Sequence, residues 1–331
     1  MESRQPQISS LGHQSQDSAA FAFTKRRRNW TESLLDSAFR WLAVVLASMV
    51  VILLIAILLS VFGGSLQAMA SYGLNFLLTS SWDPANNEYG AFTAIYGTLV
   101  TSLLALLIAV PLGVGSAVFI TEEILPYGIR KIIGIMVELL AAIPSVVLGL
   151  WAIFVMEPAL RPVLSGIHQS LGWIPVFSTA PMGPGVAPAV LILVVMLLPI
   201  ITAISRDTLD QVPVELRFAA YAVGSSRWQS ILKVIIPAAV SGIAGGVLLA
   251  LGRAMGETMA VTMIIGNSTI FSFSLLAPGN TIASMLANQF GEADGLQVSA
   301  LMYAAFVLMI LTLLVNLMAE LVVRRLRLRY Y

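Results

Sequence analysis

Two opposite charges stand inside an otherwise apolar stretch, Leu251-Gly252-Arg253-Ala254-Met255-Gly256-Glu257-Thr258. In a continuous helix, Arg253 and Glu257 lie four residues apart and share one face. An arginine at mid-membrane costs about 2.5–3.5 kcal/mol on insertion scales, so such charges usually face a bundle interior or a water-filled path. A guanidinium matches a tetrahedral oxyanion through paired hydrogen bonds. We therefore predict that Arg253, Glu257 and Thr258 line a pathway for an oxyanion.

The same charges have a structural interpretation. A buried Arg–Glu pair can tie helices together without touching any substrate. Glycines within and before this stretch favour close helix approach under both interpretations; they are Gly242, Gly245, Gly246, Gly252 and Gly256. The residues alone leave both interpretations open.

The elements that position this pair are predicted membrane spans. Of the 331 residues, 58% are hydrophobic and only 11% are charged, and a soluble fold cannot hide that much apolar surface. A spanning helix needs about 20 apolar residues, and continuous apolar runs favour helices over transmembrane strands. We predict an all-α membrane protein with six transmembrane helices, at about residues 41–63, 94–120, 132–155, 186–205, 235–265 and 298–323.

The basic residues orient these spans. Six spans place sixteen of the 18 Lys and Arg residues on one side: Arg4, Lys25, Arg26, Arg27, Arg28, Arg40, Arg130, Lys131, Arg206, Arg217, Arg227, Lys233, Arg324, Arg325, Arg327 and Arg329. By the positive-inside rule that side is the cytoplasm. Both termini are then cytoplasmic: residues 1–40 form a partly disordered tail, 41–323 the membrane domain and 324–331 a basic end. Because the basic residues report topology, no nucleic-acid partner is expected.

The predicted cytoplasmic loop 206–234 carries signals for two short helices. The run from Asp210 to Glu215 resembles a helix start, with a proline in the first turn and an acid at the positive end of the dipole. The first helix is expected to run to Val223, with Gly224 in a left-handed C-terminal cap. Ser226 and Gln229 form a capping box for the second. Exposed apolar residues around the bend suggest a docking surface; a loop lying on the lipid headgroups is the alternative.

The chain lacks the motifs of an ATPase or a metal enzyme. A P-loop requires lysine after glycine, and none of Lys25, Lys131 and Lys233 follows one. Cysteine is absent, and the two histidines, His13 and His168, are far apart, so no metal site is predicted. We expect a non-catalytic chain that binds no cofactor of its own.

The loop also resembles the signature of ABC importer permeases, written E-A-A, three residues, G, nine residues, I-x-L-P. Here the same spacing holds Phe218-Ala219-Ala220, Gly224 and Val234-Ile235-Ile236-Pro237, with Phe218 in place of the glutamate. In that family the loop is the coupling helix, which sits in a groove of a cytoplasmic ATPase. The resemblance implies this role for Phe218, Ala219, Ala220, Tyr221, Gly224, Trp228 and Pro237.

Other segments resemble the C-type permease subunits of phosphate-specific ABC importers. They are Leu249–Thr262 with Ile264–Asn267, Tyr96–Ser102 with Pro111, Glu138–Val147 and Phe76–Pro84, and the similarity spans about residues 70 to 323. It implies the type I ABC importer permease fold and phosphate translocation into the cell by alternating access. In that family the charges that match Arg253 and Glu257 are implicated in phosphate passage.

The resemblance also implies partners in a bacterial inner membrane. The protein partners are a second, homologous permease subunit, a dimer of ATPase subunits that use ATP and Mg, and an external phosphate-binding protein. The multi-pass chain itself is surrounded by the lipid bilayer. Other oxyanions such as sulfate or molybdate remain alternatives, because charge alone does not separate them. An ion-coupled secondary anion transporter is a further alternative, and it predicts activity without an ATPase.

Overall fold

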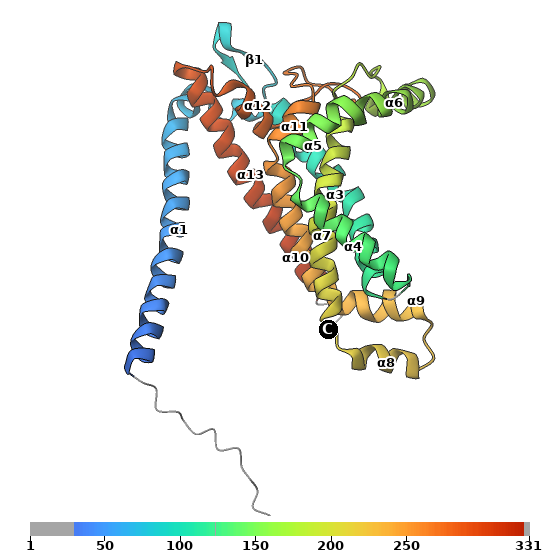
Figure 1. Cartoon of the computed structure of the whole chain (residues 1–331). Coiled ribbons are helices and arrows are strands. Elements are labelled where there is room, and N and C mark those ends of the chain that lie inside the picture. Colours follow the sequence, from blue (N-terminus) through green and yellow to red (C-terminus); the bar gives the residue numbers. More distant parts are fainter. Residues whose placement is uncertain (1–29, 123, 328–331) are drawn as a thin grey trace, which may run out of the picture. The chain divides into compact units, whose positions relative to one another are not determined.

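The computed structural model describes residues 30–122 and 124–327 (Figure 1). The predicted disordered tail therefore lies outside the described residues up to position 29, as do the last four residues of the predicted basic end. The chain divides into two units, residues 1–56 and 57–331. In the first unit, the described part of helix α1 (Trp30–Tyr72) exposes its large apolar side chains. A helix that is apolar all round is suited to lipid or to another subunit.

Six helical segments among the described residues are long and apolar enough to cross a membrane, which confirms the predicted all-α membrane fold. They are Leu34–Tyr72 in α1, Phe92–Thr121 (α3), Ser145–Leu171, Val186–Asp210 (α7), Arg227–Gly256, and Gly295–Arg325 in α13 (Gly295–Arg327). Helix α1 begins inside the predicted tail, and α13 continues into the predicted C-terminal segment.

The predicted span 132–155 is not one helix. Helix α4 (Tyr127–Ala142) ends before Pro144, and a second helical stretch follows it: α5 (Ser145–Trp151), a π-helical turn (Ala152–Met156) and α6 (Glu157–Leu171). Proline disfavours helical backbone in the residue before it, and Ile143 is extended, with ψ of 126°. The apolar run that suggested one span therefore covers a helix, a break and part of the next helix.

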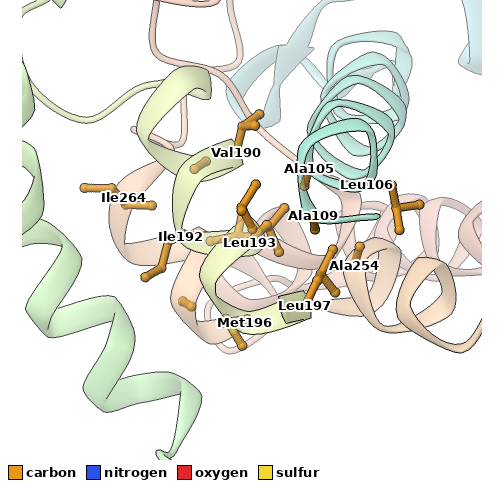
Figure 2. Packing of buried hydrophobic residues seen from close by; sticks show 14 of the residues in the cluster. Ala105, Leu106, Ala109, Val190, Ile192, Leu193, Met196, Leu197, Ala254 and Ile264 are labelled. Carbon is orange, nitrogen blue, oxygen red and sulfur yellow. The ribbon is translucent and has the colours of Figure 1, made fainter. Parts of the chain in front are cut away.

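Helix α7 forms the centre of the core in the second unit. Its side chains Ile192, Leu197 and Ile201 are fully buried against neighbours that include α3 and α10 (Ile236–Gly256). Figure 2 shows Leu193 and Leu197 beside alanines of α3 and α10. Alanine on the facing helices lets the backbones approach closely, which is how membrane helices gain packing energy without a hydrophobic drive.

The C-terminal part of α1, from Ile57, belongs to the second unit and packs against α13. The Ser299 hydroxyl accepts a hydrogen bond from Ala68 N at 2.9 Å and donates to Gly64 O at 2.8 Å. Phe76, in the short helix α2 (Asn75–Leu78), stacks on Tyr303 with ring centroids 4.4 Å apart. These contacts lock residues 64–76 to α13.

Short elements close one end of the bundle. Strands β1 (Trp82–Asp83) and β2 (Glu88–Tyr89) pair antiparallel, with Trp82 opposite Tyr89, around a 3₁₀ turn (Pro84–Asn86). Another 3₁₀ turn (Pro175–Phe177) precedes α7, and α11 (Met259–Ile264) and α12 (Ile282–Gln289) flank the loop 265–281. This loop bonds to the start of α7, where Val186 N donates to Ala277 O at 3.1 Å and Ala187 N donates to Leu275 O at 2.8 Å.

Candidate functional site

The helix that carries Arg253 ends three residues later. Helix α10 stops at Gly256, and Glu257 is extended, with φ of −67° and ψ of 120°, before α11 begins at Met259. The prediction of one continuous span over 235–265, with Arg253 and Glu257 on a single face, is therefore wrong. Glycine has low helix propensity, and Gly256 stands directly before the break.

Glu257 and Thr258 stabilise this break. The Glu257 carboxylate accepts a hydrogen bond from Ala260 N at 3.4 Å and so caps α11. The Thr258 hydroxyl donates to Gly256 O at 3.1 Å, and its carbonyl accepts from the Thr262 hydroxyl at 2.6 Å. Both side chains thus satisfy backbone groups that the interruption of the helix leaves unpaired.

Arg253 lies in the last turn of α10 with an exposed side chain. It borders a cavity of about 470 Å³ whose other lining residues are Ile200, Leu248, Leu249, Gly252 and Asn316. A cation at this position also interacts favourably with the negative end of the helix dipole. In the part of the chain that the structure describes, Arg253 and Glu257 form no ion pair. The interpretation that Arg253 and Glu257 only hold helices together requires a direct ion pair between them, and these described residues do not form one.

Asn316 of α13 is a polar residue of this cavity that the sequence analysis did not single out. Its amide nitrogen lies 3.8 Å from where a Cβ on Gly252 would stand. It also lines a second cavity, of about 430 Å³, together with Glu320. An amide within an apolar span is a recognisable signal for an internal polar surface. The same rule that selected Arg253 would therefore have found Asn316.

The predicted pair of short helices is confirmed in the loop between α7 and α10. Helix α8 (Val214–Ala222) begins after Pro213, and Gly224 takes a left-handed conformation with φ of 82°. Helix α9 (Arg227–Ser230) begins with the predicted capping box, in which Gln229 N donates to the Ser226 hydroxyl at 3.4 Å and Ser226 N donates to the Gln229 side chain at 3.0 Å. Local sequence signals therefore placed this loop correctly.

The bend between α8 and α9 exposes large apolar side chains. The exposed fractions are 66% for Phe218, 44% for Tyr221 and 52% for Trp228, whereas Ala220 is buried. Ala219 is exposed beside Phe218. Pro237 stands apart from this bend, in the first turn of α10 just after a π-helical turn (Ile231–Ile235). The predicted coupling residues thus divide into an exposed bend and a helix start.

A buried acid, Glu122, holds this loop to the end of α3. Its carboxylate, 4% exposed, forms an ion pair with Arg217 of α8, and its carbonyl accepts a hydrogen bond from Arg227 of α9. Arg217 also donates to Leu209 O of α7 at 2.9 Å. Sequence reasoning missed this anchor, because partners 95 and 105 residues apart leave no local pattern.

Comparisons with known proteins agree with this arrangement. The sequence profile described as "Binding-protein-dependent transport system inner membrane component" matches residues 109–328. The phosphate transport system permease protein PstC of Mesorhizobium japonicum is 42% identical over 299 residues, which cover 88% of this chain and 91% of the relative. The chain belongs to the PstC family of phosphate permeases.

Two further relatives are also phosphate permeases by name. PstC of Haemophilus influenzae is 41% identical and covers 92% of this chain and 98% of its own length. A probable PstC of Methanocaldococcus jannaschii is 33% identical, and the match covers 84% of this chain and 90% of the relative. These matches extend over the helices that carry both Arg253 and the α8–α9 loop.

Solved structures show the same fold at low sequence identity. A bacterial ABC transporter involved in alginate import aligns with a TM-score of 0.55 and 20% identity, over 89% of this chain and 99% of that chain. An inward-facing MetNI methionine ABC transporter aligns with a TM-score of 0.51 and 20% identity, over 72% of this chain and 94% of that chain. The predicted type I ABC importer permease fold is confirmed, and the chain is a multi-pass membrane protein of an ABC transporter.

Proposed function

We propose that this chain is the permease subunit that carries inorganic phosphate into a bacterial cell, powered by ATP that separate subunits hydrolyse. The observation that carries the proposal is Arg253, an exposed guanidinium beside a cavity within a span that is otherwise apolar. Such a charge needs a partner in the membrane. A phosphate oxyanion supplies two acceptor oxygens in the geometry that the guanidinium fork prefers.

A second permease subunit completes the pathway in this proposal. The Arg253 side chain faces outward from this chain, and the cavity beside it is lined mostly by apolar residues. An exposed cation facing hydrocarbon is costly, whereas a water-filled path between two subunits satisfies it. The homologous partner therefore supplies the opposite wall.

Glu257 has two positions in the proposed cycle. In this structure its carboxylate caps α11, which leaves the Arg253 guanidinium available to an anion. When no anion is present, Glu257 turns to hold the guanidinium, and the cap on α11 is released. Thr258 is the hinge between the two helices, and exchange between these positions would accompany alternating access.

The α8–α9 loop is proposed to dock into a groove of the ATPase dimer. Phe218, Tyr221 and Trp228 supply the exposed apolar surface, so the glutamate that Phe218 replaces is not needed for contact. One helical path, from Arg227 through the π-helical turn to Gly256, then connects the loop to Arg253. At about 1.5 Å per residue this path is a lever roughly 45 Å long.

The charge distribution orients the chain in the proposed importer. The side that holds most of the Lys and Arg residues, including those of the α8–α9 loop, is assigned to the cytoplasm of a bacterial inner membrane. ATP and Mg then act on that side, bound by the ATPase dimer. The external phosphate-binding protein delivers its ligand to the opposite side.

Reconstitution with the partner subunits tests this function. We expect the phosphate-loaded binding protein to stimulate ATP hydrolysis only when this chain is present, and sulfate or molybdate to give no stimulation. Stimulation by sulfate or molybdate would reassign the substrate. Anion flux through this chain without any ATPase would instead indicate a secondary transporter.

A further inference from the structure

A separate, basic cavity of about 480 Å³ lies among α3, α4 and α7, apart from Arg253. Three cationic side chains line it, Arg130 and Lys131 of α4 and Arg206 of α7. Its only lining carboxylate among the described residues is Glu138. Cationic side chains therefore outnumber carboxylates among its described lining residues.

The cations of this cavity differ in how they are paired. Arg206 approaches Glu138 at 3.6 Å, beyond hydrogen-bond distance, and Asp207 at 3.3 Å. Arg130 donates to Ile120 O at 3.4 Å. The Lys131 ammonium is exposed and has no ion pair or hydrogen bond with any residue that the structure describes. Lys131, with Arg206 lining the same cavity, is thus positioned to bind an added anion.

The cavity lies where a membrane surface is expected. It includes Ile120, two residues before the acid that anchors the α8–α9 loop, so it shares that end of the bundle. Helix α4 runs beside α3 and α7 there (Figure 1). The same helix exposes Ile132, Met136 and Leu139 by 59%, 64% and 63%. A basic cavity next to an exposed apolar helix face suits a ligand with an anionic head and an apolar tail.

We propose that this cavity binds the phosphate group of an anionic ligand, with Lys131 and Arg206 as the principal contacts. An anionic phospholipid headgroup and free inorganic phosphate share this chemistry. Gly134 leaves room for it, because nothing lies within 4 Å of where its Cβ would stand. A bound phosphate group would join α4 to α7 beside the coupling loop. This site is independent of the transport pathway at Arg253.

Chemical labelling of Lys131 tests the proposal. The assembled importer is placed in phosphatidylcholine nanodiscs alone, with phosphatidylglycerol added to the lipid, or with inorganic phosphate added to the buffer. Labelling of Lys131 by an amine-reactive probe is measured by peptide mass spectrometry, with Lys233 as the internal reference. We expect severalfold protection of Lys131 in the phosphatidylglycerol arm if the source is a lipid, or in the phosphate arm if it is the free ion.

Variants separate a built site from general charge attraction. Arg206→Gln removes a contact with the anion, and Gly134→Leu fills the cavity. Each variant should abolish the protection. Arg325→Gln removes an exposed cation elsewhere on α13 and should retain it. The proposal is wrong if neither ligand protects Lys131, or if protection persists in either cavity variant. It is also wrong if Lys131 is unlabelled in all three arms, because a protein partner then covers the cavity.

Discussion

The α8–α9 loop and the break after Arg253 contain the two parts of the proposed mechanism, and their structures have different origins. The loop is specified by nearby residues: a left-handed Gly224 and a capping box of Ser226 with Gln229. The break is followed by a segment held by distant residues. Ile264 O and Ile265 O accept hydrogen bonds from Gly185 N and Gly279 N, each at 2.9 Å.

This difference explains which part is readable from sequence. Capping signals act over three or four residues and keep their meaning in most contexts. Beyond the local bonds of Glu257 and Thr258, the segment that follows Gly256 depends on backbone partners that come from other elements. Variants of each region should therefore respond differently.

The largest effect is expected from Glu122→Gln, which removes the charge that holds the local loop to α3. Loss of one partner of a buried ion pair typically costs about 3 kcal/mol or more. At about 1.4 kcal/mol per tenfold change, hydrogen exchange in α8 should accelerate roughly 100-fold. The matched variant Glu320→Gln breaks an exposed pair with Arg324 and should cost only about 0.3–0.5 kcal/mol. Equal exchange rates in the two variants would show that the loop needs no distant anchor.

A smaller effect is expected from Gly97→Ala, which tests the distant contacts of the segment that follows the break after Arg253. A Cβ at this position of α3 would stand 1.9 Å from Asn280 O, in the loop that follows α11. Overpacking of this kind costs about 1–3 kcal/mol and should lower the thermal unfolding midpoint of the complex. Gly115→Ala, in the same helix with nothing within 4 Å, should leave the midpoint unchanged or raise it. A Gly97→Ala variant as stable as Gly115→Ala would contradict the close contact.

Gly224→Ala tests whether the loop is locally encoded. Space is not limiting, because nothing lies within 4 Å of a Cβ there, so only the left-handed backbone opposes alanine. The cost should be about 1 kcal/mol, seen as faster exchange at residues 222–226. Asparagine tolerates this conformation better, so Gly224→Asn should fall between alanine and the natural chain. Alanine and asparagine variants with the same exchange rate would indicate that the left-handed conformation is not needed.

The smallest effect is expected from acid at the hairpin between α1 and α3. Hydrogen bonds from the Asn86 side chain and the Ala85 N–H lower the pKa of Asp83 below its usual value. The stabilisation that these bonds provide is fully present above the pKa of an aspartate in the unfolded chain, about 3.9. It is lost as the pH falls through the lower pKa of Asp83 in the folded chain. Exchange at residues 82–89, corrected for intrinsic rates, should rise in that acid range, and Asp83→Asn should remove the pH dependence. An unchanged acid response in Asp83→Asn would assign the effect to another group.

Much of the fold was predictable from the sequence, because membrane spans are long and apolar. The exceptions share one cause. Pro144 and Gly256 interrupt helices inside apolar runs, and hydropathy alone registers no difference between a continuous helix and a broken one. Within the candidate site, Arg253 was predictable as an intramembrane charge, and the Glu122 anchor was not, because its partners come from distant parts of the chain.

Uptake of labelled phosphate by the reconstituted importer is the most direct test of the central claim that Arg253 contacts the transported anion. Arg253→Gln keeps much of the side-chain length but removes the charge and the guanidinium fork. We expect the variant to assemble with its partners and to lose phosphate uptake, whereas Arg325→Gln, assayed in parallel, retains it. Undiminished uptake by an assembled Arg253→Gln importer would contradict the claim.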